Sequence, residues 1–296
     1  MRISLSGMAW NKDEDIAVAK LLRTWQVDAI DIVPGKYFPD PLHVDTDEIA
    51  RVSQFWQQRD ISLVGMQSLL FGTQGLNLFA DHSVQQKMLD HLEAVSRIAA
   101  GLGIPVLVFG SPRNRDRQGL SDEKANDIAI SFFRRLGDIA KREGVSFCLE
   151  PNPTCYGANF MTNSAEAAST VRMVDHPAIK MQLDTGAIAI NQEDIWEILE
   201  RDADIIGHIH LSEPDLVPLG RSEVNHPEIS RALHSTLSHK ISTIEMLETK
   251  QEPLFDDHRR GAGLHDSPFI VNLQESLHEM AHFNIRHCIE CVGECF

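Results

Sequence analysis

Four residues that can bind a metal ion each stand at the end of a short apolar run: Glu150, Asp184, His210 and Glu245. The runs recur at intervals of about 26 to 35 residues, which suits a helical crossover between parallel strands but not separate domains. In a closed parallel barrel, the C-terminal ends of the strands meet at one mouth. We therefore expect the four side chains to converge around one ion.

The chemistry of this donor set indicates a divalent cation. A buried carboxylate without a partner is costly, so three carboxylates at one mouth require compensating positive charge. Three oxygen donors and one imidazole suit Mn²⁺, Mg²⁺ or Co²⁺ better than a closed thiolate zinc site, and zinc remains an alternative. Two coordination positions would stay open for substrate oxygens.

A second histidine, His208, precedes His210 by two residues and therefore shares its face of the strand. At strand spacing the two imidazoles lie about 6 to 7 Å apart, which puts His208 deeper in the barrel. We expect His210 to be the ligand. His208 is predicted to contact the substrate, with support of the metal shell or a place in the core as alternatives.

Three arginines follow strand ends near the predicted mouth. Arg113 and Arg115 come after the fourth predicted strand, and Arg221 comes after the strand that carries His210. Guanidinium groups bind phosphates and carboxylates well, so these residues are predicted to hold an anionic group of the substrate. The alternative is a solvated basic loop, because surface arginines are common.

The remaining sequence supplies the elements that would position these residues. Apolar runs alternate with segments that carry an apolar stripe at helical spacing. Strands are predicted at 2–6, 29–33, 61–66, 105–110, 146–150, 179–184, 205–210 and 241–245. Helices are predicted near 13–25, 45–56, 83–102, 121–142, 164–174, 194–201, 227–237 and 268–283. Eight such units predict an α/β fold, a (β/α)8 TIM barrel in a single domain over residues 1–296.

Composition limits the partners. The formal net charge of −16 argues against nucleic acid, because phosphate backbones are bound by clustered Lys and Arg. No apolar run approaches the roughly 20 residues that span a bilayer, and the N-terminus lacks the apolar core of a signal peptide. We expect a cytoplasmic homo-oligomer that binds a small molecule and no membrane.

The C-terminal region offers two further features. Five cysteines, an odd number, fit a reducing compartment, and Cys288, Cys291 and Cys295 are expected to be free thiols rather than a zinc site. The polar segment 248–267 is long for a loop, so we expect a lid over the mouth or an oligomer contact.

Four motifs resemble the xylose-isomerase-like TIM-barrel sugar isomerases and epimerases, particularly the ketose 3-epimerase branch. They are Cys148-Leu149-Glu150-Pro151-Asn152-Pro153, Gln182-Leu183-Asp184-Thr185-Gly186, Gly207-His208-Ile209-His210-Leu211-Ser212-Glu213 and Thr243-Ile244-Glu245-Met246. The likeness covers nearly the whole chain. It implies that the four predicted ligands bind one metal, commonly manganese, and that Glu150 and Glu245 also act as catalytic acid and base.

Two positions depart from the ketose 3-epimerase pattern. Those enzymes carry a second glutamate six residues after the first ligand and a histidine three residues after the aspartate, and both contact sugar hydroxyls. This chain has Tyr156 and Ala187 there. The departures argue against specificity for a free ketohexose.

The sequence thus predicts a metal-dependent isomerase or epimerase of a sugar or sugar phosphate. A proton next to the carbonyl of a hydroxy-ketone would be removed and returned through an enediolate. A dehydratase or lyase on a related keto-polyol could use the same centre. The negative charge argues against an abasic-site endonuclease, and the two glutamates argue against a non-catalytic sugar-binding barrel.

Overall fold

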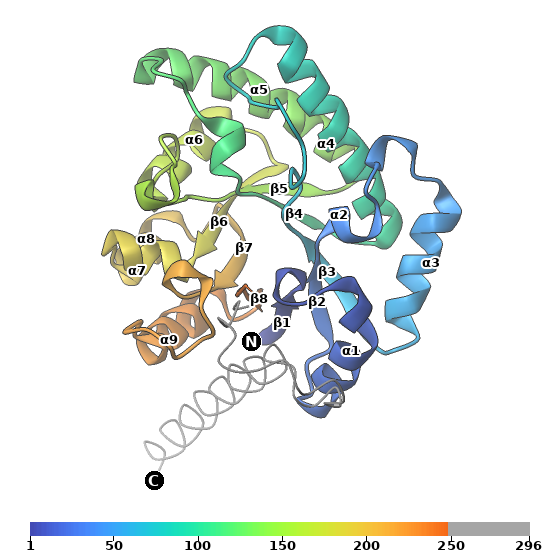
Figure 1. The fold of residues 1–296 in the computed structure, drawn as a ribbon. Coiled ribbons are helices and arrows are strands. Elements are labelled where there is room, and N and C mark those ends of the chain that lie inside the picture. The colour runs from blue at the N-terminus through green and yellow to red at the C-terminus, as the bar shows by residue number, and fades with distance from the viewer. Residues whose placement is uncertain (248–296) are drawn as a thin grey trace, which may run out of the picture.

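The apolar runs of the sequence form a closed barrel of parallel strands in the computed structural model, which describes residues 1–247 (Figure 1). The strands follow one another around the barrel in chain order, and β1 pairs with β8 to close it. They are β1 Arg2–Ser6, β2 Ala29–Ile32, β3 Ser62–Met66, β4 Val106–Phe109, β5 Ser146–Leu149, β6 Ile179–Asp184, β7 Ile206–Leu211 and β8 Ile241–Ile244. The predicted TIM barrel is confirmed.

Helices surround the barrel in Figure 1, and they begin and end at sequence signals. Asp45 caps α3 by accepting from the Glu48 N–H at 2.8 Å, and Gly103 ends α4 with a φ of +74°. The helices are α1 Asp15–Thr24, α2 Pro34–Tyr37, α3 Thr46–Gln57, α4 His82–Leu102, α5 Asp122–Glu143, α6 Ser164–Val174, α7 Thr185–Asn191, α8 Ile195–Asp202 and α9 His226–Leu237.

Seven of these helices match predictions, whereas the short helices α2 and α7 were not predicted. The predicted helix 268–283, the segment 248–267 and the three C-terminal cysteines lie outside the described residues. That all 296 residues form one domain stays a prediction. Within residues 1–247, no helix is long and apolar enough to cross a membrane.

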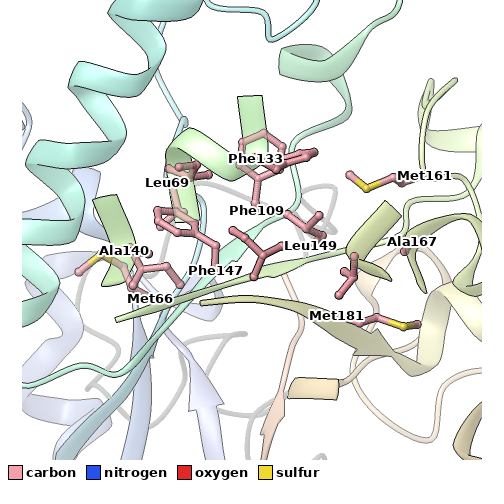
Figure 2. Packing of buried hydrophobic residues seen from close by; sticks show 14 of the residues in the cluster. Met66, Leu69, Phe109, Phe133, Ala140, Phe147, Leu149, Met161, Ala167 and Met181 are labelled. Atoms are coloured by element: carbon pink, nitrogen blue, oxygen red, sulfur yellow. The ribbon is translucent and has the colours of Figure 1, made fainter. Parts of the chain in front are cut away.

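The largest hydrophobic core lies between the strands and the helices that cover them. Figure 2 shows Phe109, Phe147 and Leu149 packed close to Phe133 of α5. The rings of Phe109 and Phe133 meet edge to face, with centroids 5.3 Å apart. This packing fixes the C-terminal ends of β4 and β5, which lead into the predicted site.

The barrel interior is polar at one level. Asp31 of β2 is fully buried, and the strand register shifts between Ile30 and Asp31. Gly65 of β3 pairs with Asp31 of β2, and a Cβ on Gly65 would lie 2.5 Å from the Asp31 carboxylate. The absence of a side chain at Gly65 therefore makes room for a buried acid.

This close approach predicts that Gly65→Ala destabilises the barrel. The added methyl group must displace a buried, hydrogen-bonded carboxylate, so we expect a loss of about 1 to 3 kcal/mol in the free energy of unfolding. Gly35→Ala is the control, because no atom lies within 4 Å of its added Cβ. Urea unfolding of both variants measures the difference, and equal stabilities would contradict the prediction.

Candidate metal centre

Four potential metal ligands converge at the C-terminal end of the barrel. Glu150 directly follows β5, Asp184 ends β6, His210 lies in β7 and Glu245 directly follows β8. One ligand atom of each lies within 4.8 Å of the others. The side chains are buried or nearly so, and that of Glu150 keeps an exposed fraction of 12%. The structure thus brings together the four residues predicted as ligands.

Backbone pairing fixes where the two glutamates emerge. The Glu150 N–H donates to the carbonyl of Phe109 at the end of β4, at 3.1 Å, and the Glu245 N–H donates to the carbonyl of Leu211 at the end of β7, at 2.9 Å. Each glutamate therefore continues its strand's pairing by one residue. The side chain of each glutamate therefore leaves the backbone at the C-terminal end of the barrel.

His210 stands between the two glutamates. Its Nδ1 lies 3.0 Å from Glu150 Oε1 and 3.2 Å from Glu245 Oε2. Burial lowers the pKa of this imidazole, but the negative charge of Glu245, with hydrogen bonds to Asp31, Glu150 and Glu245, holds it well above its usual range. The surrounding carboxylates thus favour the protonated, positively charged form of His210.

Asp184 is held by the turn that follows its strand. It caps α7 by accepting from the Ala187 N–H at 2.6 Å, and the Ser212 hydroxyl lies within 3.0 Å of both carboxylate oxygens. Burial, together with the negative charges of Glu245 and Glu150, raises the pKa of Asp184 to about 7. The three carboxylates thus place negative charge close together at the mouth, as the sequence predicts.

This donor set fits a divalent cation. Three carboxylates and one imidazole are buried within reach of a single ion, and burial together with the repulsion from Glu245 and Glu150 raises the pKa of Asp184. A cation would remove that repulsion and use the oxygen and nitrogen donors that ions such as Mn²⁺, Mg²⁺ and Zn²⁺ accept.

Asp31 supports the centre from behind and was not predicted. Its Oδ2 lies 2.6 Å from His208 Nε2 and 3.7 Å from His210 Nε2. Burial alone would raise the pKa of Asp31, but the two histidines hold it well below its usual range. The available signal was an acidic residue inside the otherwise apolar strand 29–33.

His208 lies below the mouth, on the polar level of Asp31. It is 4% exposed and contacts Thr243 Oγ1 at 3.2 Å in addition to Asp31. It does not line the pocket above His210. His208 is thus placed beneath His210 and away from the cavity lining, and its predicted contact with the substrate stays a prediction.

Gln67 is a second residue that was not predicted. It directly follows β3, is 3% exposed, and donates from Nε2 to Glu245 Oε1 at 2.5 Å. Its position after a strand matches that of Glu150 and Glu245, and this was the signal for it. The amide fixes the orientation of the Glu245 carboxylate.

A cavity of about 370 Å³ opens above the cluster. Its floor includes Glu150, Asp184 and Glu245, and its walls come from loops that follow β3, β4, β5 and β7. Tyr156 and Ala187 line it. Within residues 1–247, no Lys, Arg or His side chain contributes to the lining.

The three predicted arginines lie away from this lining. Arg115 is fully buried and donates to the backbone carbonyl of Glu150 at 2.7 Å, and burial lowers its pKa to about 10. Arg113 and Arg221 are exposed. Arg115 therefore holds the backbone at Glu150, and none of the three arginines lines the cavity, so their binding of an anionic substrate group stays a prediction.

Comparison with known proteins decides the family. Residues 19–264 match the model of the xylose isomerase-like TIM barrel family. The chain belongs to this family. A solved structure of L-ribulose 3-epimerase superposes with a TM-score of 0.77 at 16% identity, covering 98% of this chain and 97% of that one, and so shares the fold.

Two relatives of this xylose isomerase-like barrel align over shorter stretches. D-psicose 3-epimerase of Ruminiclostridium cellulolyticum is 30% identical over 114 residues, 38% of each chain. Mannonate dehydratase of Rhizobium meliloti is 27% identical over 128 residues, 40% of this chain and 32% of the relative. Each alignment therefore spans well under half of the relative.

The geometry around Glu150 predicts the effect of Gly110→Ala in this family member. A Cβ on Gly110 would lie 1.9 Å from Glu150 Oε2, so the carboxylate must move out of the cluster. We expect a loss of at least about tenfold in Mn²⁺ affinity, comparable to disturbing a ligand's support. Calorimetric titration measures the affinity, with Gly35→Ala as control. Unchanged affinity would show that Glu150 does not reach the ion.

The placement of the arginines predicts that Arg113→Ala and Arg221→Ala leave turnover nearly unchanged. Neither side chain lines the cavity, so kcat/KM should stay within about twofold, well under 1 kcal/mol in barrier height. Rates with a sugar phosphate and with its unphosphorylated counterpart measure this. A loss confined to the phosphorylated sugar would mean that an arginine reaches the substrate.

Proposed function

We propose that this barrel is a metal-dependent isomerase or epimerase that moves a proton at the carbon beside the carbonyl of a hydroxy-ketone sugar. The observation that carries the proposal is the pair Glu150 and Glu245, which come from different strands and both reach His210 Nδ1 beneath one cavity. Similarity to D-psicose 3-epimerase over 114 residues supports it.

In this proposal Glu150, Asp184, His210 and Glu245 hold one divalent ion, for which Mn²⁺ is the first choice and Mg²⁺, Co²⁺ or Zn²⁺ are alternatives. When bound, the ion supplies positive charge for the substrate oxygen that becomes negative as the proton leaves. Asp184 is fixed by Ser212 and by the start of α7, so its role is to bind the ion.

The two glutamates supply the acid and the base. Glu150 follows β5 and Glu245 follows β8, with β6 and β7 between them in the barrel. A substrate lying between them would present one face of its reacting carbon to each carboxylate. One glutamate would remove the proton and the other would return one from the opposite face, which inverts the centre.

Gln67 gives the carboxylates of Glu150 and Glu245 different surroundings. It donates to Glu245, and although burial raises the pKa of Glu245, His210 and Gln67 lower it below its usual range. Glu150 lacks this donor among its contacts within residues 1–247 and retains a small exposed fraction. Two carboxyls in different surroundings suit an acid and a base that act on opposite faces.

A dehydratase is the second candidate. It is favoured by the similarity to mannonate dehydratase, and removal of the first proton would use the same glutamates. The carbanion would then expel a neighbouring hydroxyl instead of accepting a proton. An absorbance increase from an unsaturated product distinguishes this reaction from isomerisation.

The glutamate pair predicts that Glu150→Gln and Glu245→Gln each lower kcat by at least about 100-fold, because an amide cannot act as a base. Exposed Glu197→Gln on α8 is the matched control and should retain full activity. Elemental analysis must show one ion per chain in each variant, so that a lost ion is not mistaken for a lost base.

Heavy water tests the two-face mechanism. Both carboxyls exchange with solvent, so the epimerised product should carry deuterium at the reacting carbon, as measured by mass spectrometry and NMR. Complete retention of the original hydrogen would rule out the mechanism. It would indicate a hydride shift or transfer by a single base.

A further inference from the structure

Asp31 is a buried carboxylate for which the proposed reaction has no direct use. It is fully buried inside the barrel, and its ion-pair partners among residues 1–247 are His208 and His210, with no Lys or Arg. Burying a carboxylate is costly. The barrel nevertheless makes room for it, through the register shift before Asp31 and the missing side chain of Gly65. The fold thus maintains a costly group directly behind the candidate metal centre.

The geometry of His210 determines which of its nitrogens faces an ion. Nδ1 lies 3.0 Å from Glu150 Oε1 and 3.2 Å from Glu245 Oε2, so this nitrogen is on the side of the other predicted ligands. Nε2 is on the other side of the ring, 3.7 Å from Asp31 Oδ2. An ion held together with the two glutamates must therefore use Nδ1.

The opposite nitrogen of His210 then needs a hydrogen-bond acceptor. A neutral imidazole that binds a metal through Nδ1 carries its one proton on Nε2. His210 Nε2 and Asp31 Oδ1 are both buried, and neither has a hydrogen-bond partner of ordinary length within residues 1–247. A donor without an acceptor thus lies beside an acceptor without a donor. A movement of less than about 1 Å would bring His210 Nε2 and the Asp31 carboxylate within hydrogen-bond length.

Asp31 is itself held in place from below. His208 Nε2 lies 2.6 Å from Asp31 Oδ2 and 3.2 Å from Thr243 Oγ1, and the Thr243 hydroxyl is hydrogen-bonded to the hydroxyl of Ser4. These contacts join β2, β7, β8 and β1 across the barrel interior. The orientation of the carboxylate is therefore fixed without help from His210. An acceptor arranged in advance loses little conformational entropy when it accepts a hydrogen bond.

We propose that Asp31 is a positioning residue that keeps the proton of His210 on Nε2 and so presents the Nδ1 lone pair to the ion. This inference rests on the metal site of the proposed function and deepens it. A carboxylate that accepts from Nε2–H also makes Nδ1 a stronger donor to the ion. His208 acts only through Asp31, by orienting it. The alternative is that Asp31 serves His208 and the core alone, so that ion binding does not depend on it.

The first test observes the proton on His210 directly. In protein labelled with nitrogen-15 histidine and loaded with Zn²⁺, a diamagnetic ion, long-range proton–nitrogen NMR spectra distinguish the two ring nitrogens. The His210→Gln spectrum identifies the signals of His210 by their loss. We expect the ion on Nδ1 and the proton on Nε2. An ion on Nε2, or a proton on Nδ1, would overturn the inference, and this result requires no variant of Asp31 to fold.

The second test removes the charge of Asp31 and keeps its shape. In Asp31→Asn the amide can turn its N–H toward His210 Nε2, which favours the tautomer that cannot bind the ion through Nδ1. We expect at least about a tenfold loss of affinity for Mn²⁺ and for Zn²⁺ in calorimetric titration. His208→Gln should cause a smaller loss, because it disturbs only the orientation of Asp31. Parent-like affinity in Asp31→Asn would contradict the proposal.

Asp202→Asn is the matched control for this loss of affinity. Asp202 is also fully buried, but its carboxylate pairs with Arg172 at 3.3 Å and Arg201 at 2.7 Å instead of a histidine of the cluster. Both variants should unfold at lower urea concentration than the parent, while Asp202→Asn keeps the parent affinity for Mn²⁺. A purely structural Asp31 would behave in the same way as Asp202. Equal ion affinities in the two variants would therefore overturn the inference.

Turnover separates this inference from the proposed function. The Mn²⁺-loaded parent and Asp31→Asn are assayed with D-fructose, D-tagatose and L-ribulose. Turnover by the parent, together with parent-like ion affinity in Asp31→Asn, would overturn the inference and leave the proposed function standing. The expected tautomer and an Asp31-dependent ion affinity, without turnover of any hydroxy-ketone, would support the inference and overturn the proposed function.

Discussion

Repulsion between three buried carboxylates is the interaction on which the mouth of this barrel depends. One carboxylate oxygen each of Glu150, Asp184 and Glu245 lies within 4.8 Å of the others and of His210, and this repulsion adds to burial in raising the pKa of Asp184. Such a cluster is stable only if its surroundings supply positive charge and hydrogen-bond donors. The imidazole, the Gln67 amide and the start of α7 provide part of this, and a divalent cation would provide the rest.

The same constraint extends one level deeper. Asp31 places a fourth carboxylate behind His210, in contact with His208, and thereby balances the positive charge that the upper carboxylates favour on the imidazole. A carboxylate there requires space, which the bare backbone of Gly65 leaves. His210 thus lies between the three carboxylates of the mouth and the carboxylate of Asp31, and its positive charge is stabilised from both sides.

The barrel and the convergence of the four predicted ligands could be predicted because both follow from local periodicity, whereas the contacts that support them could not. Asp31 and His208 are 177 positions apart, and Gln67 and Glu245 are 178 apart, so their pairing exists only once the barrel has closed. The arginines illustrate a second limit. The short 3₁₀ turn Pro112–Arg115 contains an exposed and a fully buried arginine, and only tertiary packing decides which is which.

The four predicted ligands and the upper walls of the cavity belong to different parts of the chain. The predicted ligands sit on or directly after strands, whose positions are fixed by the sheet, while Phe71, Tyr156 and Leu216 of the cavity lining come from three loops after β3, β5 and β7. Loops tolerate change that strands do not. A family of barrels can therefore keep one proton-transfer centre and alter its substrates by loop substitution. Tyr156 and Ala187, which depart from the ketose 3-epimerase pattern, both line the cavity, the first from the loop after β5 and the second from α7 after β6, whereas the four predicted ligands keep the pattern.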